Sequence, residues 1–354
     1  CQTTSVQIGS ASAAGLTYLW NNGASLSSVT ISNPIASPST TTTYTVTVTE
    51  TSTGCTNTDQ VIVDVGSLPS AGAGADKSIC IWSSASIGGS SSGVNPLSFS
   101  WNNGASLSST TAQFPIASPT STTTYSLTVT DNNGCTGTDQ VTVTVDPLPT
   151  ADAGTDQTIC NGDNVTLGGS PTGPTGASYQ WDNTGSLSSG TVANPTATPS
   201  TTTTYTVTVT DGTTSCTSTD QIVITVNPTP TADAGADQSI CIGDNTPIGG
   251  SPTGPSGSSY QWDNTGSLSS GTTANPVASG TITTTYTVTV TDGTTSCTST
   301  DQVTVTVNPL PVADAGINQT ICDGDNTPIG GSPTGPTGSS YQWDNTGSLS
   351  RGTA

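Results

Sequence analysis

Residues 283–307 read TTTYTVTVTDGTTSCTSTDQVTVTV, and this stretch decides the fold. Apolar and threonine side chains alternate over residues 286–290, which is the period of two that a half-buried β-strand requires. An Asp-Gly turn signal follows at 292–293, and the alternation resumes over residues 303–307. Threonine has a high strand propensity and is suited to the solvent-exposed face of such strands. We therefore expect two antiparallel strands, each with one buried and one solvated face.

The same text recurs along the chain with a period of about 81 residues. Tyr260 and Trp262 mark an earlier strand of the copy, and no segment has helical spacing. The pattern predicts an all-β protein, a tandem array of immunoglobulin-like (PKD-like) antiparallel β-sandwich domains. A disordered threonine-rich stalk is the alternative, but disorder does not require Trp, Tyr and Cys in register. One tryptophan per copy is expected in each core: Trp20, Trp101, Trp181, Trp262 and Trp343.

Pro-rich joints near Leu68, Leu148, Thr229 and Leu310 divide the chain. Incomplete sandwiches would expose strand edges, so we expect the polypeptide to continue in both directions or neighbouring chains to complete these halves. The predicted domains are an incomplete repeat lacking its first strand at 1–67, repeats at 68–147, 148–228 and 229–309, and a truncated repeat at 310–354.

Charge and composition exclude several classes of function. Lys77 and Arg351 are the only basic residues against 23 acidic ones, giving a net charge of -21, so nucleic acid is a poor partner. No apolar run approaches the roughly 20 residues that span a bilayer, so membrane insertion is not expected. Histidine is absent, so no serine has an evident activating base, and we expect no enzymatic activity.

Nine cysteines at regular intervals indicate an oxidising, extracellular compartment. The spacings alternate between 54–56 and 25 residues, which allows pairing within each domain or across the 25-residue gap at each joint. About ten residues of strand from Cys297 to Val307 cover roughly 33 Å, whereas bridged Cα atoms lie within about 7 Å. The first and last strands of a sandwich domain both run away from its amino-terminal pole, so Cys241 and Cys297 can meet there. We therefore expect pairing within each domain, with Cys322 left for an absent partner. The predicted disulfide cysteines are Cys1, Cys55, Cys80, Cys135, Cys160, Cys216, Cys241 and Cys297.

The ordered motifs ADAGxDQxICxGD, YQW, TTTYTVTVTD, CTxTDQVTVTV and NPLP resemble the PKD-like and immunoglobulin-like repeats of large Bacteroidetes-type cell-surface adhesins and gliding-motility proteins. The resemblance covers essentially the whole chain. It implies export to the cell surface, commonly by the type IX route, and a structural stalk or filament that projects a binding tip. Neighbouring repeats or like chains in a filament are the implied partners, with surface polysaccharide a further candidate. The alternatives are a repeat-based array that binds glycan or ice, and the spacer of a secreted hydrolase.

Three further features have functional and structural interpretations. No cofactor is required, but carboxylates expected at one pole of each later domain could bind calcium beside a joint or could only cap turns. Trp82 occurs in one copy only and is the best candidate for an exposed aromatic contact. Cys1 has the form of a lipidated amino-terminal cysteine, although its registry with Cys80 favours an ordinary repeat cysteine. The candidate calcium ligands are Asp152, Asp156, Asp211, Asp233, Asp237 and Asp292.

Overall fold

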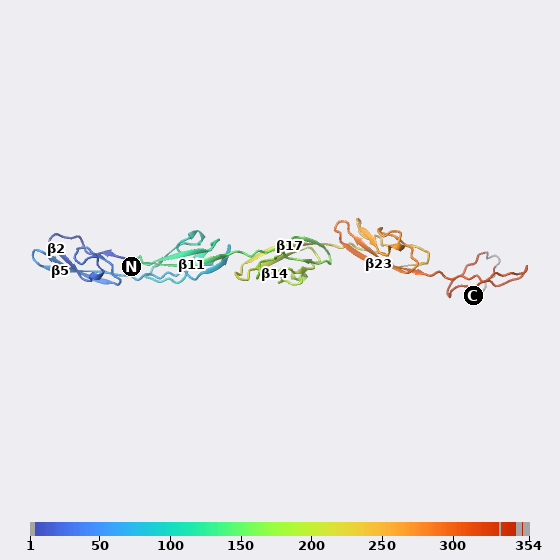
Figure 1. Ribbon diagram of the computed structural model, residues 1–354, viewed down its shortest axis with the longest axis horizontal. Coiled ribbons are helices and arrows are strands. Elements are labelled where there is room, and N and C mark those ends of the chain that lie inside the picture. The colour runs from blue at the N-terminus through green and yellow to red at the C-terminus, as the bar shows by residue number, and fades with distance from the viewer. Residues whose placement is uncertain (1–3, 333, 345–348, 350–354) are drawn as a thin grey trace.

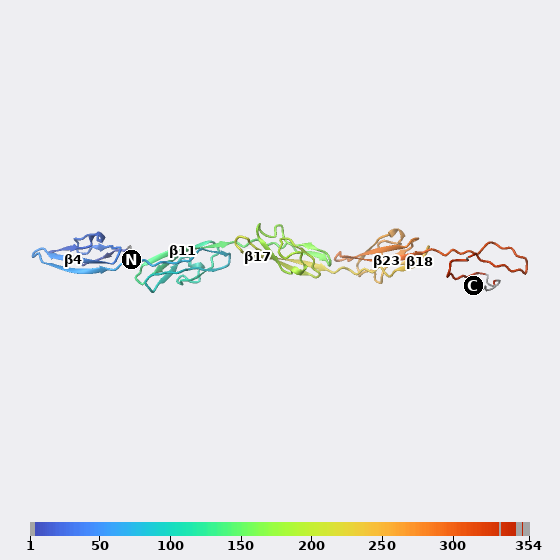
Figure 2. The same ribbon diagram turned by 90° about the horizontal axis from the view of Figure 1, so that it is seen from below.

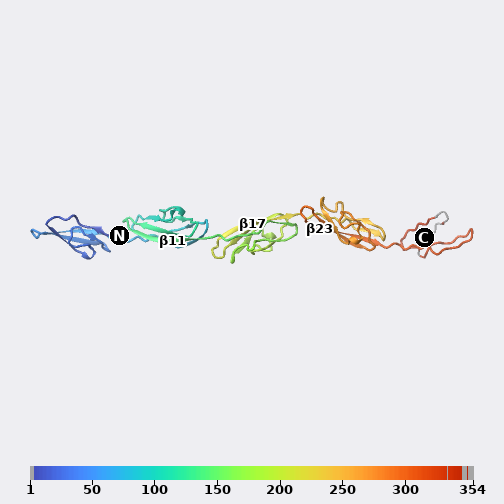
Figure 3. The same cartoon turned by 45° about the horizontal axis from the view of Figure 1, so that its top comes forward.

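The computed structural model describes residues 4–332, 334–344 and 349. Compact β units follow one another along a single long axis, and the array stays about one unit wide in three views (Figures 1, 2 and 3). The predicted fold class, a tandem array of immunoglobulin-like β-sandwiches, is confirmed. Units are numbered below in chain order by the five predicted repeats. Within the described residues, no helix has both the length and the hydropathy needed to cross a bilayer.

The second, third and fourth units share one topology. A four-stranded sheet, in the second unit β6-β11-β10-β8, faces a two-stranded sheet, β7-β9. The second unit contains β6 (Lys77–Cys80), β7 (Ala85–Ser86), β8 (Ser98–Trp101), β9 (Ile116–Ala117), β10 (Thr123–Thr130) and β11 (Thr136–Asp146). The third contains β12 (Gln157–Cys160), β13 (Val165–Thr166), β14 (Ser178–Trp181), β15 (Thr196–Ala197), β16 (Thr203–Thr210) and β17 (Thr217–Asn227). The fourth contains β18 (Gln238–Cys241), β19 (Thr246–Pro247), β20 (Ser259–Trp262), β21 (Val277–Ala278), β22 (Thr284–Thr291) and β23 (Thr298–Asn308).

The two strands predicted from residues 283–307 are β22 and β23, which pair antiparallel with Tyr286 opposite Val303. The first strand of each complete unit is the one strand of the four-stranded sheet that does not pair antiparallel. It runs parallel to the last strand, so that Cys80 lies opposite Asp146 at the carboxyl end of β11. The same parallel pairing joins β12 to β17 and β18 to β23. This direction decides where each cysteine lies.

Each core lies between the two sheets of one unit. In the third unit the Trp181 side chain is buried, and its indole N–H donates to the Val192 carbonyl at 3.0 Å. The Tyr205 hydroxyl lies 2.6 Å from the Ser186 hydroxyl, so both polar tips of the aromatic core have partners. Trp20, Trp101 and Trp262 are buried in the same way, whereas Trp343 is partly exposed. The four separate core clusters fall in the first four units.

The first unit has a three-stranded sheet, β2-β4-β5, and a short pair, β1-β3. In the described part of the fifth unit no residue is assigned to a strand, although Asp314 N–H donates to the Thr334 carbonyl at 2.9 Å. Four short 3₁₀ turns, η1 (Gly23–Ser25), η2 (Gly104–Ser106), η3 (Thr184–Ser186) and η4 (Thr265–Ser267), each follow the tryptophan strand. The first unit's strands are β1 (Val6–Gln7), β2 (Leu16–Trp20), β3 (Ile35–Ala36), β4 (Thr42–Glu50) and β5 (Thr56–Val63).

Candidate functional site at the joints between units

Disulfides cross the joints between consecutive units. Cys80 of the second unit is bonded to Cys216 of the third, and Cys160 of the third to Cys297 of the fourth, each with a Cα–Cα distance of 5.6 Å. The predicted pairing within each domain is therefore wrong. Cys135 is also disulfide-bonded, whereas Cys55, Cys241 and Cys322 are free and exposed. The predicted role of Cys1 lies outside the described residues.

The position of the first cysteine along its strand explains this correction. Within the second unit, Cys135 precedes the first residue of β11, and Cys80 lies beside Asp146 at its last residue. An 11-residue strand therefore separates the two cysteines, about 36 Å, so they lie at opposite poles and cannot bond. The pole that carries Cys80 faces the third unit, and Cys216 stands on the facing pole. The sequence argument placed both cysteines at the amino-terminal pole because it located the first cysteine at the start of its strand rather than at its end.

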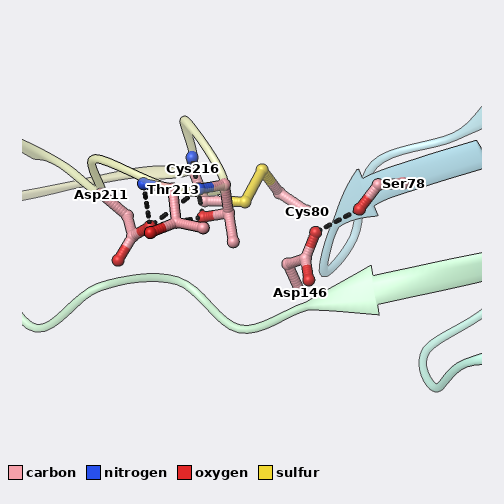
Figure 4. The surroundings of a disulfide bond; sticks show 7 residues. Ser78, Cys80, Asp146, Asp211, Thr213 and Cys216 are labelled. Carbon is pink, nitrogen blue, oxygen red and sulfur yellow. Dashed lines mark hydrogen bonds between the residues drawn. A yellow bond between two sulfur atoms is a disulfide. The ribbon is translucent and has the colours of Figure 1, made fainter.

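The Cys80 side of the joint is anchored to the end of β11. Ile81 N–H donates to the Asp146 carbonyl at 2.9 Å, which continues the parallel pairing one residue beyond the cysteine. The Ser78 hydroxyl donates to the Asp146 carboxylate (Figure 4). Cys80 is thus held on two neighbouring strand ends and reaches the next unit with little freedom of its own.

The Cys216 side is a turn built on one carboxylate. Asp211 Oδ1 accepts hydrogen bonds from the backbone N–H of Thr214 at 2.8 Å and of Thr213 at 2.9 Å, and from the Thr214 hydroxyl at 3.1 Å (Figure 4). These bonds, with that from the Thr214 backbone the strongest, hold the pKa of Asp211 below its usual value of 3.8. Ser215 takes a positive φ of 60°, and Cys216 follows with its side chain buried. The carboxylate therefore sets the position of the cysteine.

The next joint repeats this chemistry. Asp292 Oδ1 accepts from the backbone N–H of Thr295 at 2.7 Å and of Thr294 at 2.9 Å, and these bonds lower the pKa of Asp292 in the same way. Cys297 is buried, and Cys160 lies opposite Asn227 at the end of β17. A groove of about 540 Å³ lies at this joint, lined by residues of both units.

The Pro-rich linkers are also tied to the units that follow them. The Ser218 hydroxyl donates to the Pro149 carbonyl at 2.6 Å, and the Ser299 hydroxyl donates to the Pro230 carbonyl at 2.5 Å. Each linker is thereby held against the first residues of the last strand of its unit. At these two joints a disulfide connects the neighbouring units and the linker is fixed to the unit that follows it, which restricts bending and rotation between units.

The carboxylates predicted to gather for calcium do not come together. Within the described residues no three acidic, Cys or His side chains are grouped as metal ligands would be. Asp152 and Asp233 accept from the N–H groups of Gly154 and Gly235, two residues on. Asp156 and Asp237 instead accept from Val223 and Thr304 on the last strands, each at 2.8 Å, and so pin the first strand of the unit. The observed role is turn and strand capping.

Sequence reasoning missed a second pinning carboxylate. Asp220 Oδ2 accepts the Ala153 N–H at 2.8 Å, and Asp301 accepts the Ala234 N–H at the same distance. Both stand in the recurring Thr-Asp-Gln text, whose invariance from copy to copy was the available signal. Trp82 is 77% exposed and has a positive φ of 66°, so it projects from the turn that follows Cys80.

No protein-family model matches this chain, and no curated protein matches it. Solved structures that it is similar to are tandem immunoglobulin-domain arrays. An I-band fragment of titin, I67-I69, has a TM-score of 0.37 at 10% identity and covers 69% of this chain and 100% of its own. The eight amino-terminal immunoglobulin domains of Down Syndrome Cell Adhesion Molecule have a TM-score of 0.38 at 13% identity, covering 86% and 47%. The insect immune protein hemolin has a TM-score of 0.25 at 12% identity, covering 87% and 96%.

Proposed function

We propose that this chain is a covalently stapled spacer, a stalk or filament segment of a secreted bacterial surface adhesin that holds a binding region away from the cell. The single observation that carries this proposal is that both fully described disulfides bridge neighbouring units rather than closing one unit. A bond inside a unit stabilises that unit alone. A bond across a joint keeps two units in line, which is what a spacer requires.

The energetics support the same role. Each crossing disulfide closes a loop of 136 or 137 residues, which is worth about 5 kcal/mol in the chain-entropy model. The loops overlap, because Cys160 lies inside the first loop and Cys216 inside the second. The third unit is therefore constrained at both poles. No catalytic group is needed for this function, and extracellular oxidising conditions are what preserve it.

Small-angle X-ray scattering of the intact chain tests the proposal. Each complete unit adds about 40 Å along the axis, so the oxidised chain should scatter as a rod with a maximum dimension of several unit lengths. Reduction should leave the cores folded but lower the radius of gyration, because the joints then bend. A chain whose dimensions are the same before and after reduction would contradict the role of the staples, and a compact oxidised particle would contradict the spacer itself.

Ligand binding at a single site is the second candidate, and the exposed side chain of Trp82, which occurs in the second unit alone, is the observation that favours it. Aromatic faces bind sugar rings through stacking, and this side chain is free to do so. A glycan array probed with the chain and with the Trp82→Ala variant decides the matter. Glycan binding that the variant loses would favour a site at Trp82, binding that the variant keeps would favour contacts made by the repeats, and no binding by either protein would leave only the spacer.

A further inference from the structure

The turn that follows Cys160, at the joint between the third and fourth units, has an Asn-Gly pair at its centre. Asn161 and Gly162 occupy the two central positions, and the Asp163 N–H closes the turn by donating to the Cys160 carbonyl at 3.0 Å. Both central residues are exposed, and Gly162 has a positive φ of 98°, which glycine adopts without strain. Gly162 also lines the groove that residues of both units form at this joint. The pair is therefore open to solvent at the place where two units meet.

The two groups that would react with each other in this pair are both free. Asparagine is one of the thermolabile residues of proteins, and a glycine after it leaves the attacking backbone nitrogen unhindered. Within the described residues neither the Gly162 N–H nor the Asn161 side-chain amide has a hydrogen-bond partner. A Cβ placed at Gly162 would meet no atom within 4 Å, so the turn has room around it. The second and fourth units have isoleucine in place of the asparagine, at Ile81 and Ile242.

We propose that Asn161 is a modification site, at which the asparagine converts to isoaspartate and aspartate without an enzyme. The Gly162 nitrogen attacks Cγ of the Asn161 amide, and the new C–N bond closes a five-membered succinimide ring. The side-chain nitrogen leaves as ammonia, with the proton that the Gly162 nitrogen loses. Water then adds to one of the two ring carbonyls and opens the ring, which gives isoaspartate or aspartate. One neutral amide thus becomes one carboxylate, and no oxidant or reductant takes part.

Three other Asn-Gly pairs occur in the chain, and in each of them a hydrogen bond occupies one of the two reacting groups. The side-chain amides of Asn22 and Asn103 donate to backbone carbonyls at 2.8 and 2.9 Å. The N–H of Gly134, which follows Asn133, donates to a backbone carbonyl at 2.9 Å, so this nitrogen is not free to attack. The structure therefore distinguishes Asn161 from three residues with the same neighbour in the sequence.

The modification changes the anchor of one disulfide. The Asn161 N–H donates to the Asn227 carbonyl at 2.8 Å, which continues the parallel strand pairing one residue beyond Cys160. Isoaspartate adds one methylene group to the main chain directly after this bond, and it adds a negative charge beside the joint. The bond between Cys160 and Cys297 should then be easier to reduce. The disulfide between the second and third units has no Asn-Gly pair beside it and should keep its rate of reduction.

Peptide mapping of the intact, oxidised chain after storage in mildly alkaline buffer tests this inference, which goes beyond the spacer role because a spacer needs no reactive asparagine. Mass spectrometry detects the exchange of an amide for an acid, and a protein-isoaspartate methyltransferase labels isoaspartate. The peptide that contains Asn161 should convert before those that contain Asn22, Asn103 and Asn133. In urea, where the protecting hydrogen bonds are lost, all four should convert at similar rates. Earlier conversion of another pair in the folded chain, or the same order in urea, would overturn the assignment.

A variant taken from the neighbouring unit tests the site and its effect on the joint. Asn161→Ile introduces the residue that the fourth unit has at this position, so the chain should fold normally, as circular dichroism can verify. This variant should gain no isoaspartate in the third unit, whereas the matched control Asn133→Ser should still convert at Asn161.

Mild reduction followed by alkylation then compares the disulfides of stored and fresh chains. Storage should speed the reduction of the Cys160–Cys297 bond in the unaltered chain and in Asn133→Ser, and should leave it unchanged in Asn161→Ile. Equal rates in stored and fresh samples of the unaltered chain would overturn the effect on the joint. Conversion of the third-unit peptide in Asn161→Ile would overturn the modification site itself.

Discussion

Pulling the chain by its two ends should reveal a short covalent path through the third unit. The path enters at Cys216 from Cys80 and leaves from Cys160 to Cys297. Cys160 and Cys216 are 56 positions apart in the sequence. Fully extended, this segment measures about 200 Å. The folded unit already spans about 40 Å between its poles, so unfolding of the third unit should lengthen the oxidised molecule by about 160 Å.

Reduction breaks both disulfides, so the force then passes along the whole backbone of the third unit. The whole period of about 81 residues then extends, to roughly 290 Å, and unfolding of the same unit should release about 250 Å. Atomic-force spectroscopy of the chain, tethered through terminal tags with and without a reductant, measures these increments. The double variant Cys80→Ser/Cys160→Ser should give the long increment without reductant, because it lacks both staples while both poles of the third unit keep their hydrogen bonds.

A different pairing would give a different length. If Cys160 were bonded to Cys216 within the third unit, only about 25 residues of the period could extend. The increment would then be about 50 Å. Events near this length in the oxidised protein, lost on reduction, would refute the joint-crossing arrangement and with it the mechanical argument for a spacer.

Three further perturbations have defined outcomes. Trp181→Ala should lower the free energy of unfolding of the third unit by about 3–5 kcal/mol because it empties a closed core, whereas Trp82→Ala should change stability by less than about 0.5 kcal/mol in denaturant titrations. The Asp211 and Asp292 carboxylates have lowered pKa values in the folded state. Their contribution to the free energy of unfolding should therefore be complete above about pH 5 and be lost as the pH falls below 3.8, their pKa in the unfolded chain. The melting temperature of the chain should therefore be constant from pH 5 to 8 and fall at lower pH. In the double variant Asp211→Asn/Asp292→Asn this fall should be less steep. The same dependence of melting temperature on pH in both proteins would contradict the reasoning. Alkylation of the native chain should label Cys55, Cys241 and Cys322 and should not label Cys216 and Cys297. Labelling of Cys216 or Cys297 would show that the disulfides across the joints are not formed.

The repeat period, the strand pair at 283–307 and the buried tryptophans could be predicted because they follow from local properties. Alternation with a period of two can only bury one face of a strand, whatever surrounds it. Trp82 was predicted to be exposed because it occurs in a single copy and so is not part of the repeated core, and its side chain is exposed. Local sequence could not decide the role of the candidate calcium ligands, because a carboxylate two residues before a glycine can either cap its own turn or face a neighbouring group. Only the fold shows that Asp152 caps its own turn.

The amino-acid sequence by itself determined the fold class, the tandem organisation and the regular placing of cysteines, since all three are written in periodicities of the chain. Only the tertiary structure decided which cysteines bond. That choice depends on where the first cysteine lies along its strand: Cys80 is the last residue of β6, and the parallel pairing of β6 with β11 puts that residue at the far pole, beside the next unit. The register of a short strand, and so the residue at which it ends, is set by pairing with a partner some 60 residues away, and no spacing between cysteines contains it.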